Sequence, residues 1–229
     1  MKKVFIACDT TNIKLVKKII SQSQTKKIKI GYKFGLEFFY SKRGRNFIST
    51  IKKQSIFLDL KLNDIPNTCV SAINALKDLK NVEYITVHIS GGSEMLIKIK
   101  KAAKKINKKL KILGVTVLTS LSNQCLKKIG HTKSIKKLVI DQTKLAKTTK
   151  LDGIICSGHE VKIVKNICKK MDIITPGIRF VGDRVQDQKR VMTPKKAFDN
   201  GATGIVMGRS ITQGQSIKKN IQKLIYSLK

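Results

Sequence analysis

Short aliphatic runs alternate with lysine-rich stretches from one end of the chain to the other. The length of these runs and their β-branched residues predict strands. The stretches between them carry apolar residues at helical spacing, such as Ile13, Val16 and Ile20, and predict amphipathic helices. The expected strands lie at residues 4–9, 28–34, 55–62, 84–89, 111–118, 153–157, 171–177 and 204–209.

Eight strands that each precede a helix, within 229 residues, are typical of a (β/α)8 TIM barrel. The alternative α/β fold is a doubly wound open sheet, which normally has a glycine-rich turn after its first strand. Here the first predicted strand is followed by Thr10, Thr11 and Asn12 instead. Because the chain also has no Pro/Gly/Ser linker and no internal repeat, we predict a single α/β domain, a TIM barrel over residues 1–229.

The charge of the chain is strongly positive: 48 Lys+Arg against 14 Asp+Glu give a formal net charge of +34. Such a charge attracts polyanions in general, so a polyanion-binding scaffold is one interpretation. Surfaces that read nucleic acids, however, combine arginine with stacking aromatic rings. Only six residues are Arg, aromatics make up 5% and Trp is absent. We therefore interpret the lysines as the solvated outer faces of the helices and predict no specific nucleic-acid partner.

The five cysteines are an odd number without C-x-x-C spacing, which favours a reducing compartment over a zinc site or a disulfide framework. The apolar start of the chain is broken by Asp9 and is too short for a signal peptide. No run approaches the roughly 18 apolar residues of a membrane span. We expect a soluble cytoplasmic protein that has no membrane partner.

Acidic residues are scarce, and one of them lies two positions before a lysine near the end of the third predicted strand. In the run at 55–62, Ile56, Leu58, Leu60 and Leu62 alternate with Phe57, Asp59 and Lys61. The aliphatic face must pack against the helices, so the charged face points into the barrel. Burying a charge pair costs several kcal/mol per ion, which makes stability alone a poor reason for it. We predict that Asp59 and Lys61 have a catalytic role, because catalytic groups sit at the carboxyl ends of barrel strands.

Further charged residues end neighbouring predicted strands. Asp9 ends the first, Lys33 lies near the end of the second, and His88 follows Tyr84 and Thr86 on the polar face of the fourth. His88 is equally well interpreted as a satisfied core or capping residue. The coincidence of several charges at strand ends favours a shared site.

The seventh and eighth predicted strands end in segments that suit a phosphate group. One is followed by Arg179 and the other by Gly208 and Arg209. Phosphate sites of TIM barrels often use these two loops, and arginine pairs well with a phosphate dianion. The polar segment between them, residues 180–193, has the composition of a lid that closes over a ligand. An ordinary surface loop is the alternative.

Residues 59–68 (DLKLNDIPNT) resemble the D-x-K-x-x-D-I-P-N-T signature of the orotidine 5′-phosphate decarboxylase family, in its bacterial short form. The resemblance covers essentially the whole chain. Supporting matches follow in the order of the family: Asp9, Lys33, Val87-His88, Leu118-Thr119-Ser120, Cys156-Ser157, Pro176–Arg179, Asp187-Gln188 and Gly208-Arg209-Ser210.

The resemblance implies a carboxy-lyase that converts orotidine 5′-phosphate to UMP and CO₂, the last step of de novo pyrimidine biosynthesis, without metal or organic cofactor. It implies that Lys61 donates a proton to C6 of the pyrimidine and that Asp59 lies beside the substrate carboxylate. Asp64 would enter the site from the other subunit of a homodimer. A preorganised cation is the obvious stabiliser of the carbanion that forms when CO₂ departs.

The same resemblance assigns the remaining substrate contacts. Ile65 and Thr68 would come from the other subunit, and His88 belongs with the substrate-binding set through its match. Within one subunit the resemblance places Asp9 and Lys33 at the ribose, Thr119 and Ser157 at the pyrimidine, Gln188, Gly208 and Arg209 at the phosphate, and Arg179 at the phosphate end or the lid.

A related class remains as an alternative: magnesium-dependent sugar-phosphate decarboxylases or aldolases, which share the barrel and a D-x-K-x-x-D strand. The resemblance to that class would require a Glu at the end of the second strand to help hold the metal. Lys33 stands there and would repel Mg²⁺. The I-P-N-T continuation also favours the orotidine enzyme.

Overall fold

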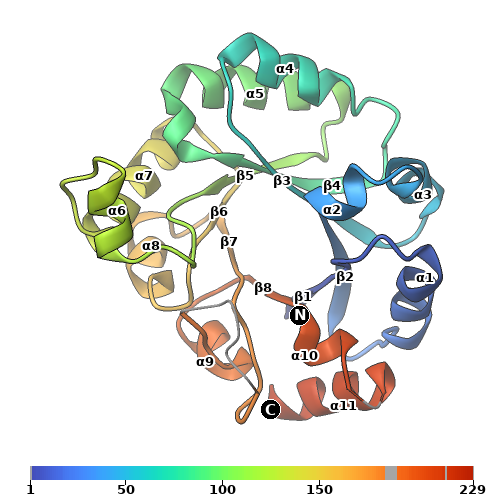
Figure 1. The fold of residues 1–229 in the computed structure, drawn as a ribbon. Helices are drawn as coiled ribbons and strands as arrows, with labels where there is room; N and C mark the ends of the chain where they lie inside the picture. The colour runs from blue at the N-terminus through green and yellow to red at the C-terminus, as the bar shows by residue number, and fades with distance from the viewer. Residues whose placement is uncertain (1, 184–189, 215, 229) are drawn as a thin grey trace.

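The computed structural model describes residues 2–183, 190–214 and 216–228, and its strands form a closed barrel. Each strand pairs in parallel with the next, and β1 pairs with β8 to complete the ring. Figure 1 shows the helices arranged around the outside of this ring. The predicted (β/α)8 TIM barrel is confirmed. Its strands are β1 (Lys3–Ala7), β2 (Lys29–Gly35), β3 (Ser55–Leu62), β4 (Val82–His88), β5 (Lys111–Val115), β6 (Gly153–Ile155), β7 (Asp172–Thr175) and β8 (Gly204–Met207).

Several helices begin at a side chain that accepts a hydrogen bond from the first turn. Asn12 caps the first helix, Ser134 the seventh and Ser216 the last. Such caps satisfy backbone N–H groups that have no partner within the helix. The helices are α1 (Ile13–Gln22), α2 (Leu36–Phe39), α3 (Gly44–Thr50), α4 (Pro66–Asn74), the short η1 (Ile89–Gly91), α5 (Gly92–Ile106), α6 (Asn123–Lys128), α7 (Ile135–Thr148), α8 (Val161–Ile167), α9 (Pro194–Asp199), α10 (Arg209–Thr212) and α11 (Ile217–Ser227).

Several aliphatic runs are longer than the strands they form. The run at 111–118 predicts three more residues than β5 contains, and the run at 4–9 extends beyond Ala7. Asp9, Val117 and Leu118 leave the sheet at the barrel rim and line a cavity there. Val117 and Leu118 resemble strand residues in the sequence because a cavity wall selects apolar side chains as a buried strand does.

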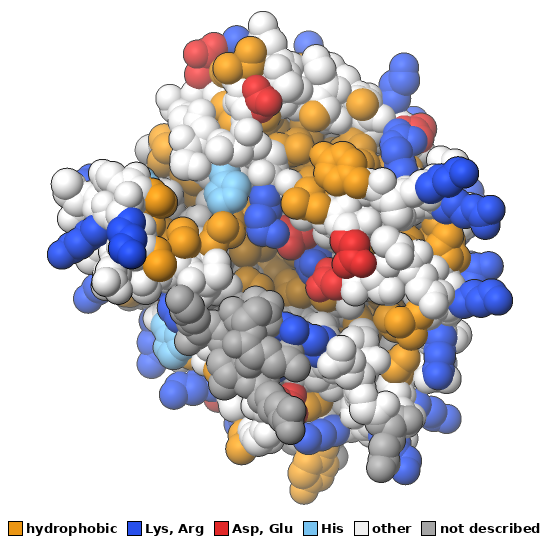
Figure 2. All heavy atoms as spheres, viewed as in Figure 1, with side chains coloured by type: hydrophobic (Ala, Val, Ile, Leu, Met, Phe, Trp, Pro, Cys, Tyr) orange, Lys and Arg blue, Asp and Glu red, His pale blue; other side chains and the backbone are white. Residues whose placement is uncertain are grey.

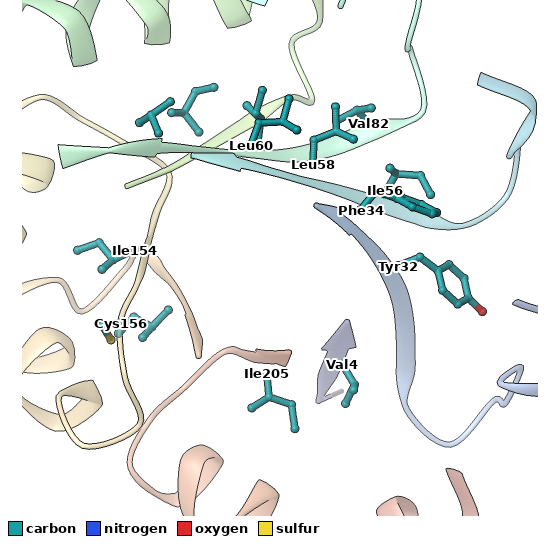
Figure 3. Packing of buried hydrophobic residues seen from close by; sticks show 14 of the residues in the cluster. Val4, Tyr32, Phe34, Ile56, Leu58, Leu60, Val82, Ile154, Cys156 and Ile205 are labelled. Atoms are coloured by element: carbon teal, nitrogen blue, oxygen red, sulfur yellow. The ribbon is translucent and has the colours of Figure 1, made fainter. Parts of the chain in front are cut away.

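The core has two layers separated by the barrel wall. The outer layer packs strands against helices and includes Ile56, Leu58 and Leu60 of β3. Figure 3 shows Leu58 and Leu60 pointing away from the barrel interior. The inner layer fills the barrel and consists of Phe5, Ala7, Phe57, Tyr84, Leu113, Val115, Ile155, Ile174 and Val206. The alternation of β3 therefore sends its aliphatic and charged faces to opposite sides, as the sequence predicts.

Aromatic rings close the amino-terminal end of the barrel. The Phe5 ring makes edge-on contacts with Phe57 and Tyr84, with centroid separations of 5.2 and 5.5 Å. The Tyr84 hydroxyl donates to Asp172, which also pairs with Lys111. This packed floor leaves the carboxyl ends of the strands as the end at which a cavity forms.

The surface around that end carries scattered cations. Figure 2 shows Lys and Arg side chains spread around the periphery of this face. Lys101, Lys104 and Lys105 of α5, for example, are exposed. This distribution fits the interpretation of the lysines as solvated helix faces. No helix among the described residues is long and apolar enough to cross a membrane.

Candidate active site

A cavity of about 710 Å³ opens at the carboxyl ends of the strands. Figure 2 shows acidic and basic side chains gathered in the hollow at the centre of this face. Phe57, Val115, Ile155 and Val206 of the inner core form its apolar base. The predicted site residues that line it are Asp9, Lys33, Asp59, Lys61, Thr119, Arg179, Gly208 and Arg209.

Four of these residues form a chain of alternating charge across three strands. Lys33 Nζ lies 2.9 Å from Asp9 Oδ1 and 3.6 Å from Asp59 Oδ2. Lys61 Nζ lies 2.9 Å from the same Asp59 oxygen. The Lys33 and Asp59 side chains are 11% and 15% exposed, whereas Lys61 (34%) and Asp9 (57%) are the more exposed members of the array. The array presents a fixed ammonium group beside a fixed carboxylate.

Mutual attraction keeps the buried members of this array ionised. Burial raises the pKa of Asp59, but Lys33 and Lys61 outweigh it and hold that pKa below its ordinary value. Burial likewise lowers the pKa of Lys33, and Asp59 and Asp9 overcome this effect and raise it. Thr86 adds a hydrogen bond of 3.0 Å to Asp59 Oδ1. Asp59 is therefore an anion at neutral pH although it is largely removed from water.

The backbone of Lys61 departs from regular strand geometry. Its φ is +49°, in the left-handed region that side-chain-bearing residues rarely adopt. The pairing of β3 with β4 shifts register between Leu58 and Leu62, and the Lys61 N–H donates to Thr86 Oγ1 at 2.9 Å instead. Bulges of this kind re-aim a side chain, and strained backbone concentrates at functional sites. The bulge turns Lys61 toward the cavity beside Asp59.

His88 is the last residue of β4 and is half-buried. Burial lowers its pKa, the charge of Lys61 lowers it further, and Asp59 opposes both. Lys61 and Asp59 are therefore close enough to affect the pKa of His88, and the lowered pKa leaves the His88 imidazole neutral at pH 7. It does not line the cavity itself.

The loops after β7 and β8 bring arginines to the same cavity. Arg179 is largely buried, and its Nη1 donates to the Ile178 carbonyl at 3.0 Å. Arg209 begins α10 directly after Gly208. Positive φ at Gly177 (+74°) allows the turn that leads from β7 to Arg179. These loops give the cavity a cationic wall suited to a phosphate. Gln188 lies outside the described residues.

Thr119 and Ser157 have different surroundings. Thr119 lines the cavity, whereas Ser157 is fully buried and its hydroxyl accepts the His159 N–H at 3.4 Å. The wall beside Ser157 is formed by Ile155 and Cys156. The structure therefore places Ser157 directly behind the cavity wall.

Asp64, Ile65 and Thr68 do not reach this cavity within the same chain. All three are exposed at the start of α4, and the Ile65 side chain is 68% exposed. Asp64 Oδ1 accepts a local hydrogen bond from the Ile65 N–H at 2.7 Å.

Sequence reasoning did not single out two charged residues beside the site, Glu160 and Arg190. They form an ion pair behind the cavity wall. The signal that could have revealed them is scarcity, because Arg and acidic residues are both rare in this chain.

The described residues contain no disulfide, and four of the five cysteines are buried: Cys8, Cys69, Cys156 and Cys168. Within residues 2–183, 190–214 and 216–228, no group of three or more His, Cys, Asp or Glu could hold a metal ion.

The fold and the cavity define a TIM-barrel enzyme with a charged site at the carboxyl ends of its strands. Residues 2–224 match the model of the orotidine 5′-phosphate decarboxylase / HUMPS family, and the chain belongs to this family.

Individual members of the family are similar to this chain over nearly its full length. The chain is 42% identical over 232 residues to orotidine 5′-phosphate decarboxylase of Wolbachia sp. subsp. Brugia malayi (strain TRS), with 100% of both chains covered. It is 39% identical to the orotidine 5′-phosphate decarboxylase of Buchnera aphidicola subsp. Acyrthosiphon pisum (strain 5A), covering 100% of this chain and 96% of the relative. The crystal structure of orotidine 5′-phosphate decarboxylase from Lactobacillus acidophilus superposes with a TM-score of 0.86 at 32% identity, covering 100% of this chain and 99% of the other.

Proposed function

We propose that this protein is a carboxy-lyase that converts orotidine 5′-phosphate to UMP and CO₂ in pyrimidine biosynthesis. Residues 1–229 act as one domain in this proposal. The observation that carries it is the pairing of Lys61 Nζ with Asp59 Oδ2 at 2.9 Å, inside a cavity whose other wall holds Arg179 and Arg209. A substrate with a carboxylate at one end and a phosphate at the other matches this distribution of charge.

Lys61 acts as the proton donor in the proposed reaction. The bond between C6 and the carboxylate carbon breaks, CO₂ leaves, and the electron pair remains on C6. The Lys61 ammonium stabilises this developing charge and transfers a proton to C6, and the neutral amine then regains a proton from water. Because Asp59 stays ionised beside the substrate carboxylate, their repulsion is relieved as CO₂ departs.

The remaining residues bind and orient the nucleotide. The phosphate lies far from C6. Its contacts contribute to catalysis because they anchor the nucleotide and so hold the pyrimidine in position for the reaction. The proposed contacts are Asp9 and Lys33 for the ribose, Thr119 and Ser157 for the pyrimidine, and Gln188, Gly208 and Arg209 for the phosphate. Arg179 is proposed at the phosphate end or the lid, and His88 belongs to the substrate-binding set.

The proposed active form is a homodimer in which each subunit completes the site of the other. Asp64, Ile65 and Thr68 would enter the partner's cavity together. Their exposure supports this role, and so do Leu36 (48% exposed) and Tyr40 (74% exposed) at α2. Figure 2 shows hydrophobic side chains gathered over α2, beside the mouth of the cavity. A second copy of the chain would cover these side chains.

The family matched by residues 2–224 also includes the HUMPS group, so a magnesium-dependent sugar-phosphate reaction is the alternative function. A divalent cation needs oxygen ligands, such as carboxylates, whose negative charge is not already neutralised by neighbouring cations. In this cavity Lys33 lies between Asp9 and Asp59, and Lys61 contacts Asp59 from the other side. Two lysines therefore occupy the space around these carboxylates, which favours chemistry without a metal.

The test is turnover of orotidine 5′-phosphate by the purified protein in the presence of EDTA. We expect UMP to form at a rate that EDTA does not change, because Lys61 supplies the positive charge. UMP can be followed by chromatography. No turnover with EDTA, together with Mg²⁺-restored activity on a sugar phosphate, would instead favour the alternative.

We also place the protein in the reducing cytoplasm. Five cysteines without a disulfide among the described residues, four of them buried, suit a compartment in which disulfides do not form.

A further inference from the structure

An ion pair lies directly behind the wall of the cavity. Glu160 directly precedes α8 and is only 6% exposed, and the Arg190 side chain is 17% exposed. Arg190 Nη1 donates to Glu160 Oε1. Neither residue lines the cavity.

The pair joins the loops that follow three consecutive strands. Glu160 uses its second oxygen, Oε2, to accept the Ser157 N–H at 2.9 Å in the loop after β6. Arg190 uses its second terminal nitrogen, Nη2, to donate to the Leu118 carbonyl at 3.2 Å in the loop after β5. Arg190 itself belongs to the loop after β7, close to Met192, which pairs with Ile178. One guanidinium group and one carboxylate thus fix the spacing of all three loops.

Leu118 and Ser157 sit next to the proposed pyrimidine contacts. Thr119 follows Leu118 directly, and Ser157 is itself one of the proposed contacts. We propose that Arg190 and Glu160 are positioning residues that hold Thr119 and Ser157 in the geometry needed to bind the pyrimidine ring. This inference rests on the proposed function.

The physical argument comes from the cost of burial. Removing two charges from water costs more than their attraction usually returns, so a buried pair is a weak source of stability. It is well suited to fixing geometry, because each partner satisfies directional hydrogen bonds to backbone groups. The pair is built from Glu and Arg, which are scarce in a chain whose cations are mostly lysine. A planar guanidinium can contact Glu160 and Leu118 at once, which a lysine ammonium does less well.

A second buried pair provides a matched control at the opposite end of the barrel. Lys100 is 8% exposed and pairs with Asp152, whose Oδ2 accepts the Ile112 N–H at 2.7 Å. This pair also links a side chain to backbone, but it touches no residue of the active-site cavity. Breaking it affects stability without affecting the site.

The test compares two ligands that differ only by the pyrimidine. The variants are Arg190→Met, Glu160→Gln and the control Asp152→Asn. Each is assayed for kcat/KM with orotidine 5′-phosphate, and the inhibition constants of UMP and of ribose 5-phosphate are measured. For Arg190→Met we expect kcat/KM to fall about 10- to 100-fold, since small misplacements of contact residues have effects of this size. UMP should bind correspondingly more weakly, while binding of ribose 5-phosphate changes by less than about two-fold. Asp152→Asn should lower the melting temperature and leave both inhibition constants unchanged.

A positioning role also predicts non-additive losses. The double variant Arg190→Met/Glu160→Gln should lose about as much activity as the worse single variant, because both act through one contact. If Arg190→Met fails to fold, Arg190→Lys serves in its place and should show the same selective loss of UMP binding with a smaller amplitude. Equal weakening of UMP and ribose 5-phosphate, or a loss no different from that of Asp152→Asn, would overturn the inference. Wild-type protein that does not turn over orotidine 5′-phosphate would instead overturn the proposed function.

Discussion

Replacing Lys61 by alanine should abolish turnover of orotidine 5′-phosphate while leaving a folded protein that binds UMP. The ammonium group is both the proton donor and the nearest cation to the carbanion in the proposed reaction. General-acid catalysis contributes about 10²- to 10⁴-fold, and loss of a preorganised charge about 10²- to 10³-fold. We therefore expect kcat/KM to fall by at least about 10⁴-fold. Product formation measures the loss, and UMP titration confirms that the site persists.

Two further variants separate chemistry from stability in this experiment. Lys61→Gly should be as inactive as Lys61→Ala. Its free energy of unfolding should be about 1 kcal/mol higher than that of Lys61→Ala, because glycine adopts a φ of +49° without strain. Lys111→Ala removes a lysine that pairs with Asp172 at the amino-terminal floor of the barrel, so it should leave kcat/KM nearly unchanged. Substantial activity in Lys61→Ala would remove Lys61 from the reaction.

Mixing Asp64→Ala protein with Lys61→Ala protein should restore activity that neither variant has alone. If Asp64 enters the partner's site, a hybrid dimer contains one site with both residues intact and one with neither. After full exchange of equal amounts, half of the dimers are hybrids, so about a quarter of wild-type activity is expected. The measurement is turnover as a function of time after mixing.

A matched mixture provides the control for complementation. Lys61→Ala mixed with the double variant Lys61→Ala/Asp64→Ala cannot form an intact site and should stay inactive. If subunit exchange is demonstrated and the first mixture also stays inactive, Asp64 does not act across the interface.

The barrel and its central charges follow from local rules of sequence. The period of two in β3 assigns Leu58 to the helix side and Asp59 to the interior, because successive side chains of a strand point to opposite faces. The eight-fold repetition of strand and helix then closes the sheet. These features depend on neighbours along the chain, so they can be predicted without a structure.

Other features depend on contacts between distant segments. The bulge at Lys61 arises from a register shift against β4, and the hydrogen bond of its N–H to Thr86 spans 25 positions of the chain. The Arg190 contact with Leu118 spans 72 positions. No local periodicity encodes such pairs. The proposed role of Asp64 would depend on a second chain, and a single subunit leaves that residue on the surface.

A crystal structure of the protein with UMP bound tests the central claim most directly. The account predicts Lys61 Nζ about 3 to 3.5 Å from C6 of the pyrimidine, which is the distance of reacting atoms. It also predicts the phosphate on Arg209, and Asp64 of a second copy beside Lys61. UMP bound with its phosphate against Lys61, or with C6 away from the Lys61 ammonium, would contradict the account.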